Sequence, residues 1–343
     1  MAITPDGSRV ISAPTSGPLR AFDLATGTLE RSFGSRGAHS LAITVDGTRV
    51  VTADGCLATH VWNLATGELE ETLEYPPGVW PGSWLTPGCS EPSGCSNLPG
   101  SILLGAAVTP DGTGVVTFGH QLALRLWDIS RPRRVPATDG HEGPVWAVAA
   151  NSDGSRIVSG GEDGVVLVWD GATGRVLCHL DGNSRSITSV AVTPDGTQIL
   201  SGDLDGVLRI WDLATGRREG TLDGSPGPIR ALAVSPDGKQ VAAGGWPDSA
   251  WVWDLASRLV ARKLDTHRGL VHSIAFRPGD KGLIAGDESG TLHLWPERGH
   301  PWEFKGEAGA VRAIALTPDG RNSSTGERAT WPASGTSWRT GAC

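Results

Sequence analysis

The 343-residue sequence predicts an all-β protein made of repeated four-stranded sheets, because three short motifs recur in register along most of the chain. The first motif is a Gly- and Asp-containing turn, which begins at Thr4, Thr44, Thr109, Asn151, Thr193, Ser235, Arg277 and Thr317. Successive turns are 40, 65, 42, 42, 42, 42 and 40 residues apart. A period of this length indicates one structural unit repeated around a closed or stacked array.

The second motif is an aromatic residue sixteen positions after the third residue of each turn: Phe22, Trp62, Trp127, Trp169, Trp211, Trp253 and Trp295. Four of the tryptophans are followed by Asp. The third motif follows the second, as DLATG at 23–27 and 212–216, NLATG at 63–67 and DGATG at 170–174. Two motifs that keep step over seven copies, with a third in four of them, do not arise by chance.

Each repeat contains four short apolar runs, as residues 145–180 illustrate with VWAVAA, RIVSG, VVLVWD and RVLCHL. Alternation with a period of two, bounded by Gly and Asp, is typical of β-strands. Pro-Asp-Gly favours a tight reversal, since proline presets φ and glycine tolerates positive φ. A single sheet of this kind cannot bury both faces, but sheets stacked radially bury a continuous core.

A repeat near 42 residues whose third apolar run ends in Trp-Asp resembles the repeat of the WD-repeat family. The resemblance covers residues 1–320 and implies a seven-bladed β-propeller of four-stranded antiparallel blades, with the innermost strand before each turn. A Pro/Gly-rich insertion at 75–101 interrupts it, and we expect an irregular tail over 321–343. Trp80 and Trp84 could make the insertion a binding loop. Cys89 and Cys95 lack a second ligand pair for zinc.

The two ends of the repeat array are unequal. Only Ala2–Thr4 precede the first turn, whereas Val311–Leu316 precede the last one. We therefore hypothesise that Val311–Leu316 occupy the inner slot of blade one and so join the two chain ends. The abrupt ends also suggest a fragment of a longer array, or a truncated or frameshifted gene.

One repeat contains a set of polar residues that could be mistaken for a catalytic triad. The family resemblance implies instead a structural tetrad in blade four, formed by His141, Ser159, Asp163 and Trp169. Blade five keeps Ser201, Asp205 and Trp211 but has Asn183 in place of the histidine. Blade seven has His267 and Trp295, but Ala285 and Ser289 at the other two positions. We expect blades three, six and seven to be looser.

Partners of related propellers are held on the top rim, at two positions that the register identifies in each blade. Trp and Arg at such positions are the residues that most often dominate binding interfaces. We expect the partner-binding residues to be Trp146, Arg230, Trp246, His272, Arg312, Glu162 and His120.

The composition and the absence of certain motifs limit the classes of function that we expect. The net charge of −8 argues against binding nucleic acid through phosphates. The sequence shows no signal peptide, membrane span, phosphate-binding loop, metal-spaced cluster or other cofactor motif. We expect a cytoplasmic, monomeric, non-catalytic scaffold or adaptor that binds proteins or peptides and needs no cofactor or metal. The alternative is a sensor or regulatory module of a signalling NTPase or kinase whose catalytic domain lies outside this chain.

Overall fold

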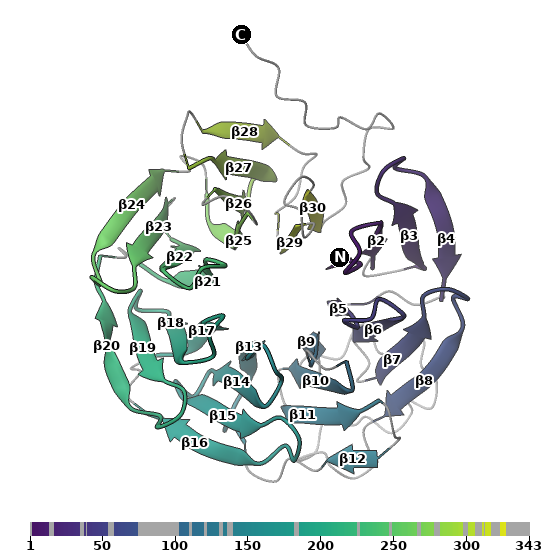
Figure 1. Ribbon diagram of the computed structural model, residues 1–343, viewed down its shortest axis with the longest axis horizontal. Helices are drawn as coiled ribbons and strands as arrows, with labels where there is room; N and C mark the ends of the chain where they lie inside the picture. The colour runs from purple at the N-terminus through teal and green to yellow at the C-terminus, as the bar shows by residue number, and fades with distance from the viewer. Residues whose placement is uncertain are drawn as a thin grey trace, which may run out of the picture.

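The computed structural model forms seven four-stranded antiparallel sheets, or blades, and one two-stranded sheet. The blades surround a central axis, with the first strand of each blade nearest the centre (Figure 1). This confirms the predicted seven-bladed propeller. The structure describes residues 2–13, 17–34, 38, 40–53, 58–74, 103–109, 112–119, 122–129, 133–135, 140–181, 185–224, 227–246, 249–265, 269–277, 282–297, 301–305, 311, 313–316 and 323–326. The insertion at 75–101 lies outside these residues.

Strand order within each blade follows the chain from the centre outwards. Blades one to four contain β1 (Ala2–Ile3), β2 (Arg9–Ser12), β3 (Leu19–Asp23) and β4 (Leu29–Phe33); β5 (Ser40–Ile43), β6 (Arg49–Ala53), β7 (Ala58–Asn63) and β8 (Leu69–Glu74); β9 (Leu103–Val108), β10 (Gly114–Gly119), β11 (Leu122–Asp128) and β12 (Arg133–Val135); and β13 (Val145–Ala150), β14 (Arg156–Gly161), β15 (Val166–Asp170) and β16 (Val176–Leu180).

Blades five to seven repeat the arrangement with β17 (Ile187–Val192), β18 (Gln198–Asp203), β19 (Leu208–Asp212) and β20 (Arg218–Leu222); β21 (Ile229–Val234), β22 (Gln240–Gly245), β23 (Ser249–Asp254) and β24 (Val260–Asp265); and β25 (Val271–Phe276), β26 (Leu283–Asp287), β27 (Thr291–Trp295) and β28 (Trp302–Lys305). The two-stranded sheet, named the closing sheet, contains β29 (Ala313–Leu316) and β30 (Ser323–Gly326).

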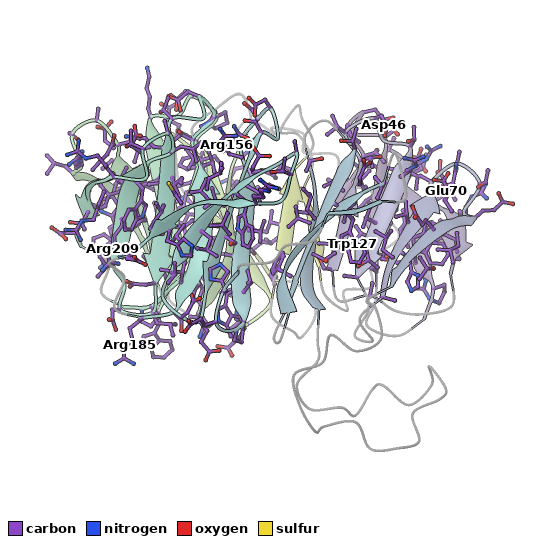
Figure 2. All side chains as sticks on the ribbon, turned by 90° about the horizontal axis from the view of Figure 1, so that it is seen from below. Asp46, Glu70, Trp127, Arg156, Arg185 and Arg209 are labelled. Carbon is purple, nitrogen blue, oxygen red and sulfur yellow. The ribbon has the colours of Figure 1, made fainter. Side chains whose placement is uncertain are left out.

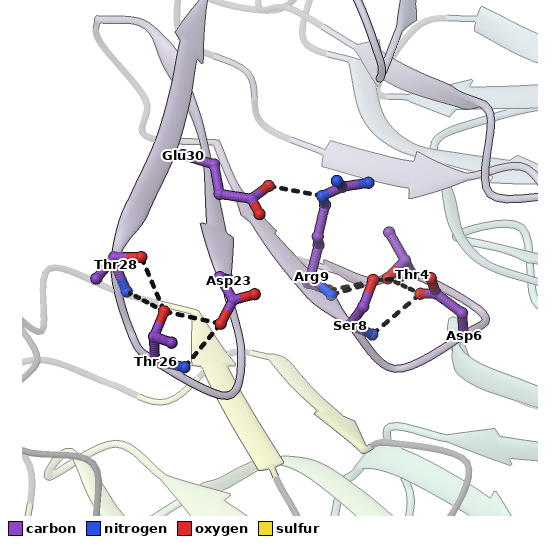
Figure 3. Close-up of polar contacts among 8 residues, drawn as sticks. All are labelled: Thr4, Asp6, Ser8, Arg9, Asp23, Thr26, Thr28 and Glu30. Carbon is purple, nitrogen blue, oxygen red and sulfur yellow. Dashed lines mark hydrogen bonds and ion pairs between the residues drawn. The ribbon is translucent and has the colours of Figure 1, made fainter.

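The turn between the first and second strands is held by its own side chains, as blade one shows (Figure 3). Thr4 Oγ1 donates to Asp6 Oδ1 at 2.5 Å, and the Ser8 backbone N–H donates to the same oxygen at 3.0 Å. Gly7 has a φ of 69°, where a side chain would be strained. These donors, led by the Thr4 hydroxyl, lower the pKa of Asp6 to about 2.

Acid should weaken the fold through these turns. Equivalent hydroxyl and backbone donors lower the pKa of Asp46 and Asp195. An Asp in the unfolded chain has a pKa of about 3.9. Below that pH the folded chain therefore binds fewer protons than the unfolded chain. The stability that the carboxylates contribute is complete above about pH 4 and is lost as the pH falls towards the folded pKa. We expect Asp195→Asn to lower the free energy of unfolding at neutral pH and to flatten its decline in acid.

Urea denaturation across the acid range measures this effect. Glu162→Gln is the control, because Glu162 lies between the second and third strands and outside the turns that join first and second strands. It should leave the pH dependence as it is. An equally steep acid decline in Asp195→Asn would contradict the role of the turn.

The core lies between neighbouring blades. Trp211 and Ile199 of blade five belong to one buried cluster with Val166 and Val168 of blade four. Hydrophobic burial is the main favourable term in folding, so each blade is stabilised by contact with the next. Three third-strand aromatic side chains are 2% exposed or less: Trp169, Trp211 and Trp253.

Inner strands dock against glycines of the preceding blade. A Cβ added at Gly202 would lie 2.6 Å from Ile229 Cγ2, at the start of the next inner strand. Gly244 has the same relation to Val271, with a distance of 2.3 Å to Cγ1. The second strand therefore needs glycine where a β-branched side chain of the next blade presses on its backbone.

Removing a buried tryptophan should destabilise the propeller strongly. We expect Trp211→Ala to lower the free energy of unfolding by about 3–5 kcal/mol, since it opens a cavity between two blades. Urea unfolding followed by circular dichroism measures this change. Trp302→Ala is the matched control, because Trp302 is 51% exposed. A similar loss in both variants would contradict the proposed core.

The ring closes differently from our sequence-based hypothesis, which is wrong. Ala2 pairs with Ile11 and Ile3 with Val10, so the N-terminal segment itself supplies the inner strand of blade one. β29 instead pairs with β30, and the closing sheet lies between blades seven and one (Figure 1). The strand at Ser323–Gly326 extends into the predicted irregular tail, because backbone pairing needs no apolar alternation. Residues 327–343 lie outside the described part of the chain.

Candidate partner-binding rim

The structure brings the four predicted tetrad residues of blade four into one hydrogen-bonded chain. His141 Nδ1 lies 3.0 Å from both carboxylate oxygens of Asp163, and His141 Nε2 lies 2.8 Å from Ser159 Oγ. Trp169 Nε1 donates to the same Ser159 oxygen at 2.8 Å. Ser159 is fully buried and its oxygen is occupied by the indole. The arrangement therefore fits a structural network.

Burial lowers the pKa of His141, although the Asp163 carboxylate acts in the opposite direction. The imidazole is therefore neutral at neutral pH, with Nδ1–H donating to Asp163 and Nε2 accepting from the Ser159 hydroxyl. Asp163 also accepts the backbone N–H of Glu142 at 2.9 Å and of Val165 at 3.1 Å. The network thus joins the segment before β13 to the turn after β14.

The tetrad requires a glycine at the end of the second strand. A Cβ at Gly161 would lie 2.4 Å from His141 Nδ1 and 2.6 Å from Asp163 Oδ1. Blades five and seven have Asp203 and Asp287 at this position. In these blades an acidic side chain occupies the place of the histidine.

Asp203 and Asp287 each pair with a basic residue six positions later. Arg209 Nη1 lies 2.5 Å from Asp203 Oδ2, and His293 Nε2 lies 2.8 Å from Asp287 Oδ2. All four side chains are 8% exposed or less. The Asp203 carboxylate also accepts two backbone N–H groups of its turn, at 3.0 and 2.9 Å. Both blades therefore have a buried pair of an acidic and a basic side chain in place of the histidine–aspartate contact of the tetrad.

Asp205 holds the position in blade five that Asp163 holds in the tetrad of blade four. The Asp205 side chain is 41% exposed and lies 3.4 Å from Arg185 Nε. His267 of blade seven lies outside the described residues. The pairs in blades five and seven could have been predicted from the spacing of six between an acidic and a basic residue, which occurs at 203/209 and again at 287/293.

The inner strands of blades three to seven each contain a β-bulge at the predicted rim position. In blade four, Val145 pairs with Gly161 and Ala147 with Gly160, so Trp146 is the extra residue between two pairs. A bulge re-aims a side chain and is common beside functional sites. The equivalent register shift occurs at four other residues: Leu104, Thr188, Arg230 and His272.

The loops between second and third strands lie beside these bulges. The Trp246 N–H donates to Pro228 O at 3.1 Å, two residues before the bulge at Arg230. The Glu162 N–H donates to Pro144 O at 2.8 Å, two residues before Trp146. Each bond fastens a loop residue next to a bulge of the same blade. The same bond recurs in blades five and seven, from Leu204 N–H to Ser186 O and from Glu288 N–H to Leu270 O.

Five predicted residues therefore lie on one arc of blades four to seven, named the rim arc: Trp146, Glu162, Arg230, Trp246 and His272. Trp246 is 56% exposed and Trp146 36% exposed. Arg230 and Glu162 are exposed, and His272 is partly buried. In Figure 2, Arg185 of a rim loop and Asp46 of a first turn lie at opposite edges of the propeller. The other two predicted residues, His120 and Arg312, lie outside the described part of the chain.

Other kinds of site are not found in the part of the chain that the structure covers. Its His, Cys, Asp and Glu side chains form no group of three or more that could hold a metal ion. Among the same residues, no helix is long and apolar enough to cross a membrane.

The radial blades, with a Trp indole that bonds to a second-strand hydroxyl, define a propeller of repeated sheets. The family model described as WD domain, G-beta repeat, matches residues 133–170, 174–212, 216–254 and 259–296. Each match begins near the outer strand of one blade and ends after the third strand of the next. Together with the seven four-stranded blades, these four matches support a propeller of the WD-repeat family. In the comparison with curated proteins, no relative matched it.

Loss of the tetrad histidine should change both stability and its pH dependence. The folded pKa of His141 is lowered, so its contribution is complete above about pH 6.5 and falls as the pH decreases through the folded pKa. We expect His141→Gln to lower the free energy of unfolding by about 1–3 kcal/mol at neutral pH, because it leaves buried polar groups without a partner. The decline below about pH 6.5 should become shallower.

Urea denaturation over this pH range measures both effects. His272→Gln, a histidine change on a partly buried rim position, is the control. A wild-type pH dependence in His141→Gln would show that this histidine does not link stability to pH.

Proposed function

We propose that this protein is a scaffold that binds proteins or peptides on the rim arc. WD-repeat propellers are in general protein-interaction scaffolds, and the four matched repeats support this proposal. Because a fold alone does not determine function, the proposal rests on the residues of the rim.

The observation that carries the proposal is the pair of exposed tryptophans at the rim. Trp146 and Trp246 are 36% and 56% exposed, on blades four and six of the same arc. Large apolar side chains in water are an unfavourable arrangement that often marks an interaction site. Tryptophan is also the residue most enriched at binding hot spots. The two indoles are therefore the proposed anchors for a partner.

The backbone around these anchors is held in place, so binding a partner should cost little conformational entropy. Trp146 is held by a register shift between two paired residues, and the Trp246 N–H bonds to Pro228 O. Preorganised side chains lose less conformational entropy on binding than mobile ones. Glu162 and Arg230 add charges of both signs beside the anchors, so the partner is expected to present apolar and charged groups together.

The double change of Trp146 and Trp246 to Ala tests the rim. Affinity purification with mass spectrometry identifies the partner, and calorimetry with that purified partner then measures the dissociation constant. We expect the double variant to bind more weakly by about 2 kcal/mol or more, which is roughly thirtyfold, because hot-spot tryptophans dominate such interfaces.

Trp302→Ala is the matched control, since it removes an equally exposed tryptophan from the outer strand β28. It should leave the dissociation constant unchanged. Unfolding curves of all three proteins exclude misfolding as the cause. Equal affinity of the double variant and the wild type would refute the rim arc as the binding site.

A further inference from the structure

The closing sheet docks on blade seven as the inner part of a regular blade would. A Cβ added at Gly286 would lie 2.3 Å from Val311 Cγ1, as at Gly244 and Val271. The Val311 N–H donates to Asp287 O at 2.8 Å, and Ser273 Oγ donates to Val311 O at 3.1 Å. The chain therefore enters β29 from the position that starts an inner strand in the other blades.

The closing sheet nevertheless contains only the first two strands of a blade within the described residues. β29 pairs with β30, and no strand in the described ranges pairs with the other edge of β30. In each of the seven blades, that edge of the second strand pairs with a third strand. An open strand edge exposes backbone donors and acceptors that can pair with another chain.

The face of blade seven beside the closing sheet is incompletely covered. Leu292 and Leu294 are on one face of β27 and are partly buried. Their equivalents in blade five, Leu208 and Ile210, are 0% and 1% exposed and pack with the blade that follows. The difference lies in the neighbouring sheet, because the positions correspond and all four side chains are aliphatic.

Blade one shows the matching deficit on its opposite face. Val10 and Phe22 are partly buried, and they hold the positions that pack against a preceding blade. Their equivalents in blade five, Ile199 and Trp211, are 0% and 2% exposed. Apolar side chains thus flank the closing sheet from both sides without full burial.

We propose that a β-hairpin of a partner protein completes the closing sheet as its third and fourth strands. Its first strand pairs with the open edge of β30, a known mode of peptide recognition. That strand must be apolar on both faces, since one faces Leu292 and Leu294 and the other faces Val10 and Phe22. The seven complete blades define this chemistry, because their third strands fill the same place. This site is separate from the rim arc and does not depend on it.

The chain itself supplies a probe of the required chemistry. Residues 207–222, VLRIWDLATGRREGTL, contain the third and fourth strands of blade five. A fluorescent synthetic peptide of this sequence is titrated with the full chain, and anisotropy measures binding. We expect saturable binding and a higher melting temperature of the complex. A peptide with Leu208→Asp and Ile210→Asp should bind at least about tenfold more weakly, because it loses apolar burial.

Changes in the protein distinguish this site from other surfaces. Leu294→Asp should weaken peptide binding at least about tenfold, because a charge then faces the bound strand. Leu259→Asp, at a residue that is 68% exposed near the outer strand of blade six, is the matched control and should bind as the wild type does. The double change of Trp146 and Trp246 to Ala should also leave peptide binding unchanged.

A variant of the strand edge keeps the test independent of the apolar faces. Successive N–H groups along a strand point to opposite edges of that strand. Proline at Ser324 or at Thr325 removes one N–H donor, and in one of the two variants this donor lies on the open edge of β30. We expect one of them to lose peptide binding while circular dichroism shows the propeller intact. Absence of saturable binding to the full chain, or binding that survives Leu294→Asp, would overturn the proposal. So would a dimer of the full chain that Leu294→Asp converts to monomer, since the occupant would then be a second copy.

Discussion

The contact between successive blades is the interaction on which the rest of the structure depends. In blades five to seven, a β-branched residue at the start of the inner strand presses on a glycine of the preceding blade, as Ile229 does on Gly202. Farther out, a tryptophan such as Trp253 fills the space between the same two sheets. Because a four-stranded sheet buries neither face alone, these contacts convert a row of weak units into one stable ring.

The polar networks of the blades vary around this constant core. Blade four combines Gly161 with a neutral, buried His141, whereas blades five and seven place an aspartate at the same position and pair it with a third-strand base. Both solutions hold the turn after the second strand through hydrogen bonds from its backbone N–H groups to a carboxylate. A buried ion pair is not a more stable choice in itself, since desolvation offsets its attraction. Its role here is to hold the same turn with different side chains.

The two surfaces proposed for partners arise from two interruptions of the regular pattern. Each bulge in an inner strand adds a residue beyond the ladder, and this sets Trp146 and Arg230 at the rim. At the closing sheet, the described residues contain no strand beyond β30, and Leu294 and Val10 are less buried than their equivalents in blade five. Regular packing thus makes the scaffold, and departures from it create the surfaces available to other molecules.

The sequence by itself determined the blade count, the strand content and the turn chemistry, because these depend on local patterns that repeat in register. The Asp-Gly turns, the third-strand aromatic residues and the rim positions could all be found by counting along the chain. The sequence could not show which end of the chain supplies the inner strand of blade one, since that depends on which strands pair in the folded structure. Nor could it show that Asp203 rather than Asp205 enters the core. Only the tertiary structure decided these points, because a side chain's partner is set by the packing of neighbouring strands and blades.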